Sequence, residues 1–153
     1  MKRLLIEPFK RLEKANFYTI RFENEGISET DKFISRFDGH NQYRDDLDII
    51  IYWIYKMGNQ NGTLERYFRP ERQAQAIPLE TAGLRLYCIR LSDELVILGN
   101  GGIKESRTVQ DSPDAWPAFD VMNRLTGKLN RSLRSGETRR RGPLLSGTLE
   151  FEI

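Results

Sequence analysis

The stretch that decides the fold runs from residue 83 to residue 107 and reads GLRLYCIRLSDELVILGNGGIKESR. It contains two aliphatic-rich runs, at 84–91 and 95–98, separated by the short polar segment 92–94. This arrangement predicts a β-hairpin. The second run is apolar at four consecutive positions, so we expect a central strand that is covered on both faces.

Side chains alternate between the two faces along the first strand of this hairpin. One face is expected to carry Leu84, Leu86 and Cys88, and the other Arg85, Tyr87, Ile89 and Leu91. The charge of Arg85 therefore lies among apolar neighbours, which is unusual for an arginine without a function.

A glycine-rich segment, residues 99–102, follows the second strand. It lacks the Gly-Lys-Ser/Thr ending of a phosphate-binding loop and the spacing of a dinucleotide-binding fingerprint. Because glycine adopts backbone conformations closed to other residues, the segment predicts a bulge or a strand exit. Either would direct Lys104 and Arg107 just beyond the sheet.

The composition is that of one soluble globular domain, residues 1–153, with 39% hydrophobic and 30% charged residues. No apolar run approaches the roughly 18 residues of a membrane span. Glu7 and Pro8 cut the first apolar run short, so we expect neither a secretory signal nor membrane association. The expected location is the cytoplasm.

The residue types argue against metal or thiol chemistry. The single cysteine, Cys88, is expected to be a buried small hydrophobe, and the single histidine, His40, makes a histidine-based metal site or a serine triad improbable. Three aspartates, at 45, 46 and 48, are explained by the dipole of the helix that they begin, with a metal site as the alternative. We expect no metal and no cofactor.

Local patterns place the remaining elements. Residues 17–22 and 63–69 predict strands, 28–37 and 42–57 predict helices, and 71–79 predict a polar connector, while 1–15 stay open between a strand and a short helix. A C-terminal extension from about residue 113 predicts a helix that stops at Gly136, a loop at 137–143 and a half-buried strand at 147–153. This order favours an α+β fold, an antiparallel or mixed sheet with helices on one side.

The extension concentrates positive charge. Lys128, Arg131, Arg134, Arg139, Arg140 and Arg141 lie within fourteen positions that contain one acidic residue, Glu137. Such a cluster attracts phosphates, so RNA binding is one interpretation. The alternative is a solvated helix face followed by a mobile basic loop.

The hairpin, its exit glycine and the basic residues after it together resemble the central motif of the RelE/ParE/HigB superfamily of type II toxin-antitoxin toxins. The resemblance covers the middle two thirds of the chain. It implies a RelE-like fold, with two N-terminal helices on a curved sheet of four to five strands. It also implies a metal-independent endoribonuclease that cuts messenger RNA, usually on the ribosome, and a cognate antitoxin protein as partner.

The resemblance also implies the site residues. Arg85, after the glycine that opens the hairpin, and Lys104, after the exit glycine, would bracket the scissile phosphate, while Tyr87 would stack on a base or orient a proton transfer. It adds Arg66, Arg69 and Arg107 as RNA-binding residues, and Arg139, Arg140 and Arg141 of the basic cluster described above would complete the RNA-binding set. The aromatic or histidine residue that many RNA-cutting members carry near the C-terminus has no clear counterpart.

Other interpretations of the same residues stay open. Arg85 and Arg90 could form cross-strand salt bridges with Glu65, Glu94 or Glu150. The fold could instead serve as a module that binds nucleic acid or protein without turnover. A third alternative is the ParE branch, whose members inhibit DNA gyrase.

Overall fold

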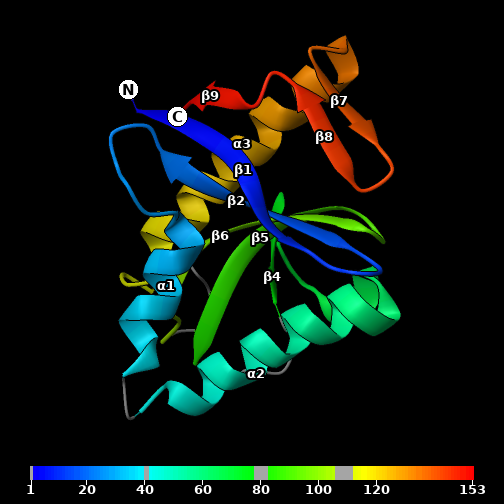
Figure 1. The fold of residues 1–153 in the computed structure, drawn as a ribbon. Helices are drawn as coiled ribbons and strands as arrows, with labels where there is room; N and C mark the ends of the chain where they lie inside the picture. The colour runs from blue at the N-terminus through cyan, green and yellow to red at the C-terminus, as the bar shows by residue number, and fades with distance from the viewer. Residues whose placement is uncertain (1, 40–41, 78–82, 106–111) are drawn as a thin grey trace.

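The structure is a computed structural model that describes residues 2–39, 42–77, 83–105 and 112–153 (Figure 1). The fold is α+β, and the described part contains three α-helices, a seven-stranded sheet and a separate two-stranded hairpin. The helices are α1 (Glu29–Asp38), α2 (Arg44–Lys56) and α3 (Trp116–Ser135). The strands are β1 (Arg3–Arg11), β2 (Asn16–Phe22), β3 (Arg69–Glu71), β4 (Ala74–Ile77), β5 (Leu84–Ser92), β6 (Leu95–Ile103), β7 (Thr138–Arg141), β8 (Leu144–Gly147) and β9 (Glu150–Glu152).

The large sheet has the order β3-β4-β5-β6-β2-β1-β9. Neighbouring strands are antiparallel except β2 and β6, which are parallel. The sheet is therefore mixed, as expected, but it has seven strands rather than four to five. At one edge, beside β1, lies β9, which falls within the strand predicted at 147–153; at the other edge lies the short β3.

Both faces of the sheet are covered, so the expectation of helices on one side is wrong. Helices α1 and α2 pack on the face that carries Leu84, Leu86 and Cys88. Helix α3 packs on the opposite face, against Tyr87 and Ile89. The sheet consequently lies between two helical layers (Figure 1), and the alternation expected along the first hairpin strand is confirmed.

Local sequence explains the helices. The Ser28 side chain accepts a hydrogen bond from the Asp31 N–H and caps α1, whose Phe33 and Phe37 are buried. Helix α3 ends at Gly136, which adopts the left-handed conformation at φ 84° that glycine tolerates best. The C-terminal boundary confirms the predicted stop of this helix at Gly136. In the described part of the chain, no helix has both the length and the apolar composition that crossing a membrane requires.

The hairpin of β5 and β6 is confirmed, and it contains the bulge that the glycines predicted. The pairing shifts between Leu86 and Cys88, so that residues 99 and 100 of β6 together lie opposite Tyr87. The glycine segment therefore lies inside β6 and is not a strand exit. Gly101 then packs so close to β5 that a Cβ atom there would lie 1.9 Å from the Arg85 carbonyl oxygen.

Four local predictions are corrected. Residues 63–69 are not a strand, because 65–67 form a 3₁₀ turn and only Arg69 begins a strand. The expected connector at 71–79 instead contains β4, and residues 78–82 lie outside the described chain. The arginine triplet lies in β7 rather than in a loop, and the expected strand at 147–153 is shortened to β9. The undecided N-terminal segment forms β1.

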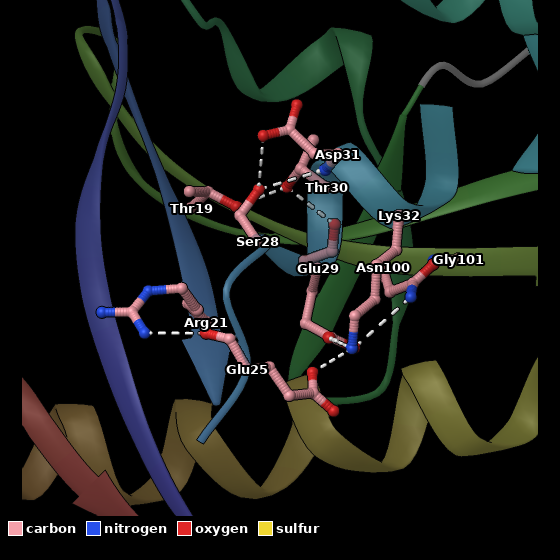
Figure 2. Close-up of polar contacts among 11 residues, drawn as sticks. Thr19, Arg21, Glu25, Ser28, Glu29, Thr30, Asp31, Lys32, Asn100 and Gly101 are labelled. Atoms are coloured by element: carbon pink, nitrogen blue, oxygen red, sulfur yellow. Dashed lines mark hydrogen bonds and ion pairs between the residues drawn. The ribbon is translucent and has the colours of Figure 1, made fainter. Parts of the chain in front are cut away.

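A buried polar network fixes the bulge to α1 (Figure 2). The Thr30 hydroxyl donates to the Gly99 carbonyl oxygen at 2.9 Å and lies 2.6 Å from the Thr19 hydroxyl. The Asn100 side chain donates to Glu29 at 3.3 Å, and Glu29 is also paired with Lys32 at 2.7 Å. The bulge is therefore held by specific partners on α1 and β2.

Replacing Thr30 by valine should destabilise the fold by about 1–3 kcal/mol, because the same volume remains but the buried Gly99 carbonyl loses its donor. The free energy of unfolding from urea titration measures this loss. The matched control is Ser35→Ala, an exposed position on the same helix, where we expect a change within about 0.5 kcal/mol. Equal stabilities of the two variants would contradict the role of the network.

Candidate functional site

Strand pairing brings several predicted site residues onto one face of the sheet. Arg69 of β3 pairs with Ala76 of β4, and Ala76 pairs with Tyr87 of β5. Paired residues project to the same face, and alternation places Arg85 on that face too. Ala76 lies between Arg69 and Tyr87 on this face, and its small side chain leaves space above β4 for the long side chains of β3 and β5.

The centre of this arrangement is Glu71, which sequence reasoning missed. The Lys104 ammonium lies 3.4 Å from the Glu71 carboxylate, and each side chain is only 10% exposed. The Glu71 charge also acts on Arg85 and Tyr87. We refer to Arg69, Glu71, Arg85, Tyr87 and Lys104 as the Glu71 cluster.

Arg85 is a buried cation. It is 6% exposed, and its Nη1 donates a hydrogen bond to the Leu84 carbonyl oxygen at 3.0 Å. Burial lowers the pKa of the Arg85 guanidinium, and the nearby positive charge of Arg69 lowers it further. An arginine nevertheless stays protonated in proteins, so the cluster holds positive charge in a poorly solvated place.

Tyr87 adds a neutral hydrogen-bond donor. Its side chain is fully buried, and among the described residues its hydroxyl has no hydrogen-bond partner. Burial raises the pKa of the phenol, and the negative charge of Glu71 raises it further. The hydroxyl therefore keeps its proton at neutral pH and can donate it to a ligand.

Aromatic residues of α3 cover the cluster. The Phe119 ring packs edge to face on Tyr87, with centroids 5.7 Å apart, and Trp116 packs on Phe119 at the same separation. Trp116 is 38% exposed, so three rings connect the surface to the cluster. Sequence reasoning missed Trp116 as a residue near the cluster, since its place in the first turn of a helix gave no signal.

Asp114 fastens the beginning of α3 to the rest of the fold. One carboxylate oxygen accepts a hydrogen bond from Arg36 of α1 at 2.7 Å, and the other accepts one from the Ile103 N–H at 2.7 Å. Burial alone would raise the pKa of Asp114, but these two donors and the Arg36 charge hold it below its ordinary value. The carboxylate thus joins α1, β6 and α3.

Replacing Asp114 by asparagine should remove its charge and leave an oxygen for the Ile103 N–H. Because folding lowers the Asp114 pKa, the charged form stabilises the fold at neutral pH, and this contribution disappears as pH falls through the folded pKa. The pair is partly exposed, so we expect a loss of about 0.2–1 kcal/mol at pH 7. Urea titrations at pH 7 and pH 3 measure the free energy of unfolding of the variant and of wild type. A difference that is larger at pH 3 than at pH 7 would contradict the stabilising role of the charged Asp114.

The other predicted RNA-binding residues lie apart from the Glu71 cluster or outside the described chain. Arg66 is exposed, and its guanidinium lies 5.2 Å from the centre of the Tyr67 ring. Arg139, Arg140 and Arg141 line a different hollow. Arg107 falls in 106–111, outside the described residues.

The competing structural interpretations are partly resolved. Arg90 pairs with Asp93 and also donates a hydrogen bond to the Thr63 carbonyl. Its carboxylate partner is therefore Asp93 and not Glu65, Glu94 or Glu150. Asp46 accepts hydrogen bonds from the Gly83 and Leu84 N–H groups, which ties α2 to β5.

Cys88 is fully buried, and burial raises the pKa of its thiol. Within the described residues, no group of three His, Cys, Asp or Glu side chains is placed to hold a metal ion.

The Glu71 cluster thus combines three cations, one carboxylate and one protonated phenol. Cations stabilise the charge that develops on a phosphorane, a carboxylate accepts a proton, and a phenol donates one.

A scan against protein-family models found no match to this chain, and searches of curated proteins and of solved structures found none that is significantly similar.

Proposed function

We propose that this protein is a RelE-like toxin of a type II toxin-antitoxin system, a metal-independent endoribonuclease that cuts messenger RNA on the ribosome. The convergence of Arg85, Tyr87 and Lys104 around Glu71 carries this proposal. The element order supports it as well, because α1 and α2 precede the antiparallel strands β4, β5 and β6, which is the order that the resemblance implies. The partner in this proposal is a cognate antitoxin protein.

The proposed reaction is an attack of the RNA 2′-oxygen on the adjacent phosphorus, which breaks the bond from phosphorus to the 5′-oxygen. Glu71 accepts the 2′-hydroxyl proton, and Tyr87 donates a proton to the leaving 5′-oxygen. Arg85 and Lys104 stabilise the additional negative charge of the phosphorane. The products are a 2′,3′-cyclic phosphate and a 5′-hydroxyl.

Access to the cluster requires a movement. Arg85 and Tyr87 are both buried, and Phe119 of α3 lies directly on the Tyr87 ring. In this proposal the N-terminal turns of α3 separate from the sheet when RNA binds, which breaks the contacts of Asp114 with Arg36 and Ile103. The structure then corresponds to the closed, resting form.

Expression in growing bacteria tests the proposal. Induction of the wild-type chain should arrest growth and produce new 5′ ends within translated messages. Arg11→Ala, an exposed cation outside the cluster, should behave like wild type. Normal growth with intact transcripts after induction of a folded wild-type chain would overturn the proposal.

The burial of the cluster favours a second candidate, an RNA-binding module without turnover. If α3 stays closed, Arg85 and Tyr87 serve only the core, and RNA meets only exposed cations such as those of β7. This candidate is distinguished by RNA binding with a steep salt dependence while ribosome-bound message stays intact.

A further inference from the structure

The cations of the C-terminal extension, which are exposed except for the half-buried Lys128, form a second, independent feature. Lys128, Arg131 and Arg134 lie on α3, and Arg139, Arg140 and Arg141 follow in β7. Arg124, one turn before Lys128, is paired with Asp120 at 3.1 Å. In contrast, none of those six cations forms an ion pair with a carboxylate in the described part of the chain. We call these six residues the basic surface.

The basic surface borders two shallow hollows, and α3 contributes residues to both. The larger measures about 800 Å³ and lies between α3 and the β7–β8 hairpin, where Arg90, Asn130 and the three β7 arginines line it. The smaller measures about 470 Å³ and lies where α3 meets the turn between β3 and β4. Its polar lining is Gln73, Asn123, Arg124, Lys128 and Arg131.

The lining chemistry suits a phosphate backbone. Both hollows present cationic side chains beside side-chain amides, and the larger one also presents hydroxyl groups; these are the side chains that contact phosphate and sugar oxygens. No aromatic residue lines either hollow among the described residues. Sites for single-stranded nucleic acid use aromatic rings on which bases stack, whereas double-stranded RNA is recognised by contacts to phosphates and 2′-hydroxyls.

The same observations disfavour an acidic protein as the partner. Protein interfaces gain most of their energy from buried aromatic or arginine anchors in well-packed pockets. Here the hollows are open, and their apolar lining consists of Leu91 and Leu133 in one and Ile153 in the other. An extended polyanion matches such a surface better than a folded partner does.

The hairpin that carries the arginines is fixed in place. The Arg140 guanidinium donates a hydrogen bond to the Leu91 carbonyl oxygen at the end of β5. The Thr138 hydroxyl donates to the Thr148 carbonyl at 2.6 Å and lies 2.6 Å from the Ser132 hydroxyl of α3. Arg139 and Arg141 are therefore presented by a rigid support rather than by a mobile loop.

We propose that the basic surface binds the backbone of double-helical RNA, independent of sequence, and so docks the protein beside the strand that it cleaves. This inference rests on the proposed function, since it adds a docking site for double-helical RNA to a protein that cuts a neighbouring RNA strand. The β3–β4 turn connects the two sites, because Gln73 lines the smaller hollow and Glu71 lies two residues earlier in the cluster. The Gln73 N–H donates to Asn123 of α3 at 3.1 Å, which holds this turn against the basic surface.

Fluorescence anisotropy tests the inference with a labelled RNA hairpin and an unpaired RNA of the same length, titrated across a range of salt concentrations. We expect tighter binding of the hairpin by wild type. Two double variants, Arg139→Ala/Arg141→Ala and Lys128→Ala/Arg131→Ala, should each weaken hairpin binding at least about tenfold and reduce the salt slope by about 2. Arg131, Arg139 and Arg141 are exposed and Lys128 is half-buried, so both variants should fold.

The matched control is Arg11→Ala/Lys14→Ala, which removes the same charge from exposed positions elsewhere and should leave hairpin affinity unchanged. Lys104→Ala should also bind the hairpin like wild type while cleavage falls, which separates failure of docking from failure of catalysis. The inference is overturned if both surface variants bind like this control. It is also overturned if unpaired RNA or poly-glutamate binds wild type as tightly as the hairpin.

Discussion

Replacing Arg85 or Lys104 by alanine should each reduce RNA cleavage by about 10²–10³-fold, and the double variant should have no measurable activity. Both side chains supply positive charge from poorly solvated positions, where electrostatic stabilisation of a phosphorane is strongest. The rate at saturating RNA measures this loss. Affinity for RNA should change little, because we propose that the basic surface, and not the cluster, provides the docking.

A structural loss must be separated from a catalytic one. Removing Lys104 takes one ion-pair partner from the Glu71 carboxylate, which is 10% exposed, and breaking a buried pair costs up to about 3–5 kcal/mol. The double variant Lys104→Ala/Glu71→Gln removes both charges and should recover most of that stability without recovering cleavage. Arg85→Lys should regain part of the rate because it keeps the charge, although it lacks the planar guanidinium. If Lys104→Ala remains folded and cleaves RNA at the wild-type rate, the assignment is wrong.

Replacing Gly101 by alanine should have the largest effect on folding, a loss of about 3 kcal/mol or more. The added Cβ would lie 1.9 Å from the Arg85 carbonyl oxygen and 2.8 Å from a carbon of the Phe33 ring. Overpacking costs about 1–3 kcal/mol where side chains can adjust, and a backbone carbonyl in a central strand pair cannot. Because small domains are stable by only about 5–15 kcal/mol, this variant should lose much of its cooperative unfolding transition.

Two other glycines provide a graded comparison. A Cβ at Gly99 would lie 2.5 Å from the Met122 sulfur, which belongs to a flexible side chain, so Gly99→Ala should cost less than Gly101→Ala. At Gly26 no atom lies within 4 Å, so alanine there should change stability by about 0.5 kcal/mol or less. Denaturant titration of the three variants should rank them in this order. Equal stabilities would contradict the packing of the bulge.

Much of the fold could be predicted because its signals are local. The hairpin follows from two apolar runs around a polar turn, α1 follows from the Ser28 cap, and the end of α3 follows from Gly136. Strands β3, β4 and β7 could not be predicted in the same way. They are three or four residues long, and their pairing depends on neighbours that are distant in sequence.

The candidate site was predicted in part for the same reason. Alternation along β5 placed Arg85 and Tyr87 on one face, but it gave no information about depth. Both residues are buried, and α3 packs on Tyr87. Glu71 was missed because its role depends on the pairing of β3 with β4 across the sheet. Trp116 was missed because only the packing of α3 brings its ring beside Phe119.

The most direct measurement adds the purified protein to ribosomes that carry a labelled message and identifies the ends of the products. We expect fragments with a 2′,3′-cyclic phosphate and a 5′-hydroxyl from the wild-type chain, and intact message from a folded Arg85→Ala/Lys104→Ala variant. Intact message with the wild-type chain, or equal cleavage by that variant, would contradict the claim that the Glu71 cluster cuts RNA.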